Sequence, residues 1–596
     1  MMSGLGSSHN KVSTSAFNYK RGPPLSRVFA VDVHDVDSDK FQDSQNAGFS
    51  WYILMTTLLV SLSAVNIGWS IGITNFSKSV ICKLHPTGPM EAQSANEFPD
   101  RIPFSESAWS VAIGILSVGG LIGALISGAI ADRIGRRNAL VINNGFFLAG
   151  SVLMGTSTTA LHFSLGRFVM GVGCGVASGV ATIYVGEIAP IRWRGFYGTF
   201  FQLALVLGIL IAQLVAMYVT TGLQWRVVVA LPGVLSVVQV ALLPLHVESP
   251  IYLIKARHVN EARHALLKLR RGFDVSTEWQ ESLASLDSGE ADTYSSSAVV
   301  RESPVQSEPQ LANAAQNDSN VTIKYIAAQA QQLVKISASG CAPNPDASSP
   351  TVSSLAAPEA RFIPPISIWH IVCGRTRDDL RHLVACSSVL MALQQMAGIA
   401  TILFGGNEMA NSVFYPEFPL SAPWACIIIC LTALPAIFIC ILWVDKLGRR
   451  PLLLGSLGGM TICSILAAIG MIFNIGALII AGVFVCYFMF NFGLGTIPWF
   501  FVSESVPAYA LGATTVLGCS LNWVLAIILG LLVPIIGEQI QGCLFIVIGC
   551  ICMIGFIFVM ICVPETMDRS VTRIVAKHAG PLHTVIKFRT RAAKKM

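Results

Sequence analysis

The sequence predicts an all-α membrane protein with twelve transmembrane helices, which form two pseudo-symmetric bundles of six helices each. Hydrophobic residues make up 53% of the 596 residues and charged residues only 12%, about half of the roughly 25% that is usual in globular proteins. Twelve apolar runs are each long enough to cross a bilayer, and short motifs of the first half recur in the second. This composition excludes a soluble globular protein, a disordered chain and a nucleic-acid-binding protein.

The apolar runs are interpreted as helices because lipid offers the backbone no hydrogen-bond partner, so a spanning segment must satisfy its own peptide groups. A bilayer core of about 30 Å requires about 20 residues of helix. The predicted spans cover residues 51–74, 108–130, 139–157, 162–186, 199–220, 227–246, 383–405, 422–444, 451–473, 477–502, 512–534 and 541–563.

The loops between the spans differ in positive charge. Three basic residues lie at 133–137 after the second span and three lie at 446–450 after the eighth, whereas the loop between the third and fourth spans has none. Lys and Arg concentrate in cytoplasmic loops, so we expect both termini of this multi-pass protein to be cytoplasmic, with the plasma membrane as its compartment. The net charge of +6 then reflects topology and contact with anionic membrane lipid, and no nucleic-acid partner is needed.

The segments outside the spans are polar, and the longest of them separates the two bundles. Its ends are helical in pattern, whereas residues from about 275 to 365 are rich in Ser, Ala, Gln and Pro without apolar periodicity, which is typical of disorder. We expect any cytoplasmic protein partner to bind this insertion. The predicted organisation is a polar cytoplasmic N-terminus (1–50), an N-terminal bundle (51–246), a cytoplasmic loop (247–382), a C-terminal bundle (383–563) and a basic cytoplasmic tail (564–596).

Two charged motifs recur in the two halves of the chain. The stretch at 132–137 (DRIGRR) recurs 313 residues later at 445–450 (DKLGRR), and the surroundings of Glu187 recur 317 residues later around Glu504. Nearly constant offsets imply two bundles with the same orientation. Parallel repeats of this kind form a substrate site near the midplane and rock about it.

These motifs also predict a conformational latch at the cytoplasmic helix ends. Glu248 after the sixth span and Glu565 after the twelfth form a third repeated pair. Acidic and basic side chains that pair in only one of two states bias the equilibrium between the states; the alternative is that the basic residues only anchor the loops. The predicted latch comprises Asp132, Arg133, Arg136, Arg137, Arg167, Glu187, Arg194, Glu248, Asp445, Arg449, Arg450, Glu504 and Glu565.

With these motifs the chain resembles the sugar porter branch of the major facilitator superfamily, most closely the facilitative glucose transporters. The resemblance runs in family order from about residue 50 to 570. It implies the major facilitator fold and sugar transport by alternating access. The chain has no nucleophile–base set, phosphate loop or metal-spaced Cys/His cluster, so we expect no enzyme, cofactor or metal site. Matching motifs include Gly166-Arg167-Phe168, Gln394-Gln395-x-x-Gly398-Ile399, Ile497-Pro498-Trp499-Phe500, Asn522-Trp523 and Pro564-Glu565-Thr566.

A sugar site needs amide side chains, which donate and accept hydrogen bonds as hydroxyls do, and an aromatic surface for the apolar ring faces. Gln202, Leu205 and Ile209 share one face of the fifth predicted span. The resemblance implies sugar contacts at several of these positions; the alternative is that the amides join helices and the tryptophans pack. The predicted substrate site comprises Gln202, Leu205, Ile209, Gln394, Gln395, Ile399, Ala400, Phe404, Asn491, Gly495, Trp499, Asn522 and Trp523.

Several positions depart from the glucose-carrier pattern. Two amides and two phenols are lost from the C-terminal half of the site, and each unmet buried hydroxyl of a sugar costs about 1–3 kcal/mol. Glucose binding is therefore expected to be weaker by orders of magnitude, which leaves the substrate open among hexoses, polyols and more apolar solutes. The departures are Ala400, Phe404-Gly405, Ala433, Asn491 and Leu511.

The sequence favours transport without proton coupling. Proton-linked sugar porters usually carry an aspartate in the first span, where this chain has Ser70. No predicted span has a carboxylate or a histidine at its centre, and a proton-coupled carrier needs a titratable group in the pathway. The predicted function is therefore uniport of a hexose or polyol; the alternatives are a transporter-like sugar sensor with little flux and a facilitator of a non-sugar solute.

Overall fold

Helices make up the regular structure, as expected for apolar runs that must satisfy their own backbone. The computed structural model describes residues 48–73, 81, 101–218, 224–271, 273, 275–276, 278–280, 282, 368–373, 379–397 and 422–578. Most of the polar N-terminus and the end of the basic tail therefore lie outside the described residues, as does the predicted disordered insertion except for residues 275–276, 278–280 and 282, which are largely helical.

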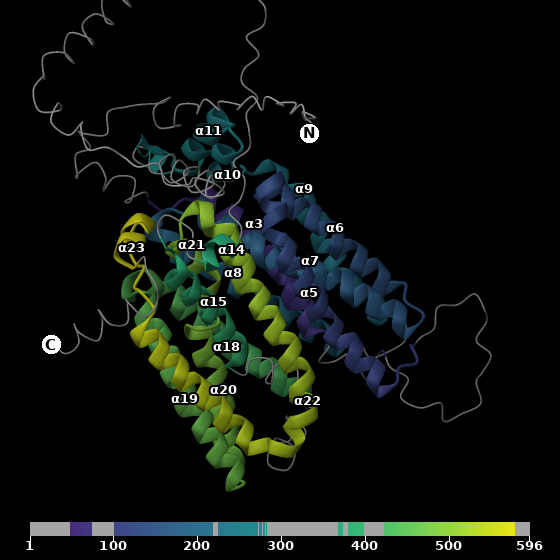
Figure 1. The fold of residues 1–596 in the computed structure, drawn as a ribbon. Helices are drawn as coiled ribbons and strands as arrows, with labels where there is room; N and C mark the ends of the chain where they lie inside the picture. Colours follow the sequence, from purple (N-terminus) through teal and green to yellow (C-terminus); the bar gives the residue numbers. More distant parts are fainter. Residues whose placement is uncertain are drawn as a thin grey trace, which may run out of the picture. The chain divides into compact units, whose positions relative to one another are not determined.

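Within the described residues, the first half of the chain contributes six long α-helices and two short ones. The two short helices lie at one end of the long ones in Figure 1. The long helices are α3 (Trp51–Gly72), α5 (Glu106–Ile134), α6 (Arg136–Gly155), α7 (Ala160–Ile188), α8 (Arg194–Tyr218) and α9 (Gln224–Leu242), and the short ones are α10 (Pro250–Lys255) and α11 (Val259–Leu269).

The second half contributes a matching set of helices. Its last long helix, α22, spans 54 residues, and its ribbon turns back on itself at the lower end of Figure 1. The elements are α14 (Ile368–Val372), α15 (Arg381–Met396), α18 (Ala422–Leu447), α19 (Arg449–Ile472), α20 (Gly476–Phe492), α21 (Ile497–Ser505), α22 (Ala508–Ile561) and α23 (Val571–His578).

Eleven segments among the described residues are long and apolar enough to cross a membrane. They match eleven of the twelve predicted spans. The seventh predicted span, 383–405, is described only as far as Ala397, and its helix α15 has 16 residues. The eleventh and twelfth predicted spans belong to one helix, α22, in which Ala508–Leu531 and Leu544–Ile561 are the two candidate spans.

Glycines allow the helices of the first half to approach one another closely. A Cβ atom at Gly171 of α7 would lie 2.1 Å from the carbonyl oxygen of Leu116 in α5, and one at Gly68 of α3 would lie 2.0 Å from that of Leu205 in α8. Helices in lipid gain little from hydrophobic exclusion and associate through such close backbone packing. Larger residues at these positions would push the helices apart.

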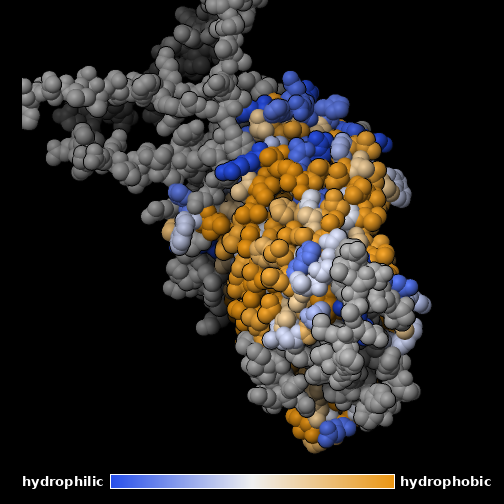
Figure 2. Space-filling model, turned by 90° about the vertical axis from the view of Figure 1, so that its right-hand side faces the viewer, coloured by the Kyte–Doolittle hydropathy of each residue, from blue (hydrophilic) through white to orange (hydrophobic). Residues whose placement is uncertain are grey.

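Both charged repeats begin a helix in the same way. Gly135 before α6 and Gly448 before α19 each have φ of 95°, a left-handed conformation that side chains disfavour. The two halves therefore share a turn of the same geometry at equivalent positions. The long helices also present apolar residues outward, and Figure 2 shows a broad hydrophobic face with hydrophilic residues gathered at one end, as expected for a surface in contact with lipid.

Candidate functional site

One group of predicted site residues joins the two halves of the protein. Gln202 lies on α8, Asn491 at the end of α20 and Trp499 on α21. Gln202 Nε2 donates to Asn491 Oδ1 at 3.0 Å, and Trp499 Nε1 donates to Gln202 Oε1 at 3.2 Å. All three side chains are buried. One glutamine of the first half thus bridges two helices of the second half.

A second amide group lies within the second half. Gln395 on α15 donates to Asn522 Oδ1 on α22 at 3.0 Å, and Asn522 Nδ2 donates in turn to Gln394 Oε1 at 3.0 Å. Gln394 Nε2 donates to the backbone oxygen of Gly495 at 2.8 Å. Gln394 and Asn522 are buried and Gln395 is partly exposed. The three amides therefore form one connected network around the unwound turn between α20 and α21.

Trp523 follows this network on α22 and reaches the first half of the chain. Its Nε1 donates to Ser178 Oγ of α7 at 3.4 Å. A Cβ atom at Gly120 of α5 would lie 2.5 Å from the indole ring, so the ring packs directly on the backbone of α5. The sequence did not identify Ser178, because nothing in the sequence distinguishes a serine that hydrogen-bonds to another helix from one that only packs within an apolar helix.

The remaining predicted site residues have different positions. Ile209 is buried and Leu205 is partly buried, and both pack in an apolar cluster between α8, α18 and α20. Gly495 lies in the turn before α21. Ile399, Ala400 and Phe404 lie outside the described residues. The structure thus places the amides and Trp499 of the predicted site in two hydrogen-bonded groups, whereas Trp523 donates to Ser178.

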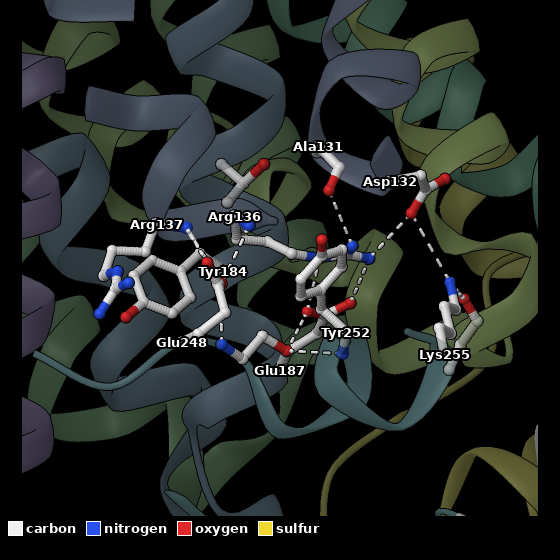
Figure 3. A network of polar contacts seen from close by, with 12 residues as sticks. Ala131, Asp132, Arg136, Arg137, Tyr184, Glu187, Glu248, Tyr252 and Lys255 are labelled. Carbon is white, nitrogen blue, oxygen red and sulfur yellow. Dashed lines mark hydrogen bonds and ion pairs between the residues drawn. The ribbon is translucent and has the colours of Figure 1, made fainter. Parts of the chain in front are cut away.

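Two of the predicted latch residues, Asp132 and Glu187, contact the buried guanidinium of Arg136 (Figure 3). Arg136 Nε lies 2.8 Å from Glu187 Oε2, and its Nη2 lies 2.9 Å from Glu187 Oε1 and 3.1 Å from Asp132 Oδ1. Two carboxylates thus compensate one fully buried cation, which an apolar environment requires.

The second half repeats this arrangement around Arg449. Arg449 Nη2 lies 2.6 Å from Glu504 Oε1 and 2.8 Å from Asp445 Oδ1. Arg449 Nε lies 2.9 Å from Glu504 Oε2. The internal repeat recognised in the sequence is therefore a repeat of charge geometry as well. Each half holds one arginine between one glutamate and one aspartate.

Glu248 and Glu565 have equivalent roles at the two helix starts. Glu248 accepts hydrogen bonds from the backbone N–H groups of Arg136 and Arg137 at the start of α6. Glu565 accepts those of Arg449 and Arg450 at the start of α19, both at 2.9 Å. A carboxylate at a helix N-terminus satisfies unpaired N–H groups and the helix dipole. Burial raises the pKa of Glu248, and these hydrogen bonds oppose that rise.

Three polar contacts join the two halves at this end. Asp445 Oδ2 accepts a hydrogen bond from Phe196 N at the start of α8, at 2.7 Å. Lys255 of α10 donates to the backbone oxygen of Ala508 at the start of α22, at 3.1 Å, and lies 3.7 Å from Asp132 Oδ1. Arg194 Nη1 lies 3.5 Å from the backbone oxygen of Ser503. The end that carries the charged repeats is therefore closed in this structure.

Lys255 was absent from the predicted latch because it belongs to no repeated motif. Its side chain is buried, and burial lowers its pKa although Asp132 opposes that shift. Arg133 and Arg167, which were predicted, lie apart from the network. Arg133 is exposed, and the Arg167 guanidinium donates to the backbone oxygens of Ser70 and Ala112 between α3, α5 and α7.

Arg137 and Arg450 add matching contacts to backbone oxygens. Arg137 Nη1 donates to His246 O at 3.0 Å, and Arg450 Nη2 donates to Met560 O at 2.5 Å. His246 follows the end of α9 and Met560 lies in the last turn of α22, so each arginine binds the chain near the end of the last long helix of its half. Within the described residues, no group of three His, Cys, Asp or Glu side chains is placed to hold a metal ion.

Comparison with known proteins agrees with this architecture. Residues 56–315 and 367–577 match the family described as "Sugar (and other) transporter". The chain is 27% identical over 546 residues to the facilitated glucose transporter member 3 of solute carrier family 2 from Ovis aries, covering 89% of this chain and 94% of that protein. It is 29% identical over 503 residues to facilitated glucose transporter protein 1 of Caenorhabditis elegans, covering 79% and 81%.

Solved structures show the same fold. The proton:xylose symporter XylE, bound to 6-bromo-6-deoxy-D-glucose, superposes with a TM-score of 0.62 at 18% identity, covering 88% of this chain and 99% of that chain. A partially occluded inward-open form of XylE from E. coli gives a TM-score of 0.56, covering 87% and 100%. With its family match extending over most of the helical chain, this multi-pass membrane protein belongs to the sugar transporter family of the major facilitator superfamily, a family of transport proteins and not of enzymes.

Proposed function

We propose that the protein is a uniporter that moves a hexose or a related sugar or polyol down its gradient by alternating access. The observation that carries this proposal is the buried polar bridge of Gln202, Asn491 and Trp499 between the two halves. Amides at membrane depth are costly unless they pair or line a pathway. These residues lie between the two halves, and parallel repeats generally bind their substrates at such a junction, which supports the proposal.

The amide networks suit a solute with several hydroxyl groups. Each amide offers a donor and an acceptor, as a hydroxyl does, so a sugar can replace an amide partner without leaving either group unsatisfied. In the structure the partners of Gln202 are Asn491 and Trp499. We infer that substrate binding exchanges these hydrogen bonds for contacts with hydroxyl groups.

The absence of proton coupling is supported by the charges of the described spans. Their carboxylates are Asp132, Glu187, Asp445 and Glu504, all at the end that carries the charged repeats. Ser70 donates to the backbone oxygen of Asn66. The described spans therefore have no carboxylate at their centres to serve as the proton-binding group of a symporter.

Uptake by purified protein in liposomes tests this proposal. We expect saturable uptake of one or more members of a hexose and polyol panel. We also expect that an imposed pH gradient, with the membrane potential clamped, leaves the rate unchanged. A rate that rises several-fold with an inward proton gradient would contradict uniport. Saturable sugar binding without flux would instead identify a sensor, and uptake confined to non-sugar solutes would contradict the substrate class.

We further propose that the closed end and both termini face the cytoplasm, and that the protein works in the plasma membrane. The orientation is supported by the basic side chains at the closed end, since Lys and Arg concentrate on the cytoplasmic side. A tag at either terminus of the protein in intact cells should then be inaccessible to antibody until the membrane is permeabilised. Labelling of either tag in intact cells would overturn this orientation.

A further inference from the structure

We propose that a cavity at the start of α3 binds the phosphate headgroup of an anionic phospholipid. The cavity has a volume of about 160 Å³, which is several times the roughly 30 Å³ that one liquid water occupies. It is lined by residues of three segments: the start of α3, Pro190 before α8, and the chain that follows α11. The lining residues that the argument uses are Phe49, Trp51, Tyr52, Arg271 and Phe273.

Two cations meet at one aromatic ring beside this cavity. Lys268 Nζ lies 5.0 Å and Arg271 Cζ lies 5.8 Å from the ring centroid of Tyr52. Tyr52 is held in place because its hydroxyl accepts a hydrogen bond from Val247 N at 3.1 Å and its ring stacks on His246. Two like charges on one ring repel each other, so a bound anion would stabilise them.

Lys268 and Arg271 differ from the neighbouring Arg270, whose guanidinium already has an acidic partner. Arg270 also lines the cavity, but its guanidinium is engaged by Glu278 at 2.6 and 2.9 Å and by the backbone oxygen of Ile188. In the described part of the chain neither Lys268 nor Arg271 forms an ion pair. Arg271 is exposed and Lys268 is partly exposed, so both can reach an anion at the surface.

The start of α3 adds a further feature that favours an anion. No side chain caps this 22-residue helix, so its first-turn N–H groups and its dipole favour negative charge.

The position of the cavity favours a lipid over a soluble ion. The candidate span of α3 begins at Trp51 and that of α8 at Ile191, so the cavity lies where the bilayer meets water. Trp51 is 67% exposed and Phe49 and Phe273 are each 38% exposed. Exposed aromatic rings at this depth are typical of the membrane interface, and basic pockets between helices there bind anionic headgroups.

The test uses the full-length protein in nanodiscs of phosphatidylcholine, with or without phosphatidylserine. We expect phosphatidylserine to raise the midpoint of thermal unfolding, and spin-labelled phosphatidylserine to quench tryptophan fluorescence saturably. In a double variant, Lys268→Gln with Arg271→Gln, the apparent affinity for phosphatidylserine should fall about fivefold for each cation removed. Arg263→Gln, an exposed arginine of α11 that does not line the cavity, is the matched control and should keep the full response.

The remaining outcomes overturn the proposal. If the double variant responds to phosphatidylserine as the unaltered protein does, the cavity is not the site. If inorganic phosphate added to phosphatidylcholine nanodiscs gives the same stabilisation, the occupant is a soluble phosphate and not a lipid. The readouts are stability and lipid affinity, so they do not depend on which solute the protein transports.

Discussion

At the scale of single residues, the buried amides are the groups that we propose to recognise the substrate. Gln202 is the only residue of the first half that belongs to either amide network of the described structure, and it contacts both Asn491 and Trp499. The sequence identified these residues individually through residue type and resemblance. It did not predict the pairing of Gln202 with Asn491, because 289 residues separate them and spacing along one helix carries no information about a partner on another.

Replacing Gln202 with alanine should reduce sugar uptake roughly tenfold or more. The change removes a buried amide and leaves Asn491 and Trp499 without that partner, and an unsatisfied buried group costs about 1–3 kcal/mol. Uptake in liposomes at matched protein content measures the effect. Ile211→Ala is the control, because Ile211 lies on the same helix with 42% of its side chain exposed. Equal uptake by both variants would exclude Gln202 from the site.

His246 should make stability depend on pH below neutrality. Burial and the nearby charge of Lys268 lower the pKa of His246 below its usual 6.5. The folded state therefore binds fewer protons than the unfolded state between that lowered pKa and 6.5, so the free energy of unfolding falls as pH falls through this range. His246→Gln should remove this part of the pH dependence of thermal unfolding. His264→Gln, an exposed histidine on α11, should leave it unchanged.

At the scale of elements, equivalent turns and caps give the two halves matching ends. Gly135 and Gly448 have the same φ. Glu248 and Glu565 accept hydrogen bonds from the backbone N–H groups of the residues that follow these two glycines. The repeat was visible in the sequence because charged motifs recur at nearly constant offsets. The role of each glutamate as a helix cap was not visible, because the cap and its helix are more than 100 residues apart.

Gly135→Ala should destabilise the protein by about 1–2 kcal/mol or more, since an L-residue is strained at this φ. Its Cβ would also lie 2.5 Å from Glu248 Oε2. Thermal unfolding in detergent measures the change. Gly145→Ala in α6 is the control, because no atom lies within 4 Å of its added Cβ and alanine favours the helix. An unchanged melting midpoint for Gly135→Ala would contradict the strained turn.

Lys255→Met should open the closed end more often. The variant loses a charged hydrogen bond to Ala508 O and the attraction to Asp132, and a charged hydrogen bond is worth about 1.5–3 kcal/mol, or about tenfold or more in the equilibrium. Labelling of a Ser503→Cys reporter, which lies at the junction with Gly186, measures this opening. Lys446→Met, at an exposed lysine, should leave labelling unchanged. Equal labelling in both variants would remove Lys255 from the latch.

At the scale of the whole molecule, hydropathy alone was sufficient to locate the spans. Eleven candidate spans lie where the apolar runs predicted them, because the requirement to satisfy the backbone in lipid acts on every residue of a span. The sequence did not predict that helical structure continues between the eleventh and twelfth spans in α22, because residues 537–542 (GEQIQG) are more typical of a loop. It also could not show which end is closed, because that depends on contacts between the halves.

The segment between the two halves links them covalently, and through Lys255 it also binds the second half directly. This lysine lies on α10, after the last long helix of the first half, and holds the first turn of α22. Lys255, which makes this contact, therefore precedes the long stretch that follows α11. We expect a protease that cuts the polypeptide within that stretch to leave the two halves joined by the contacts of Lys255, Arg194 and Asp445.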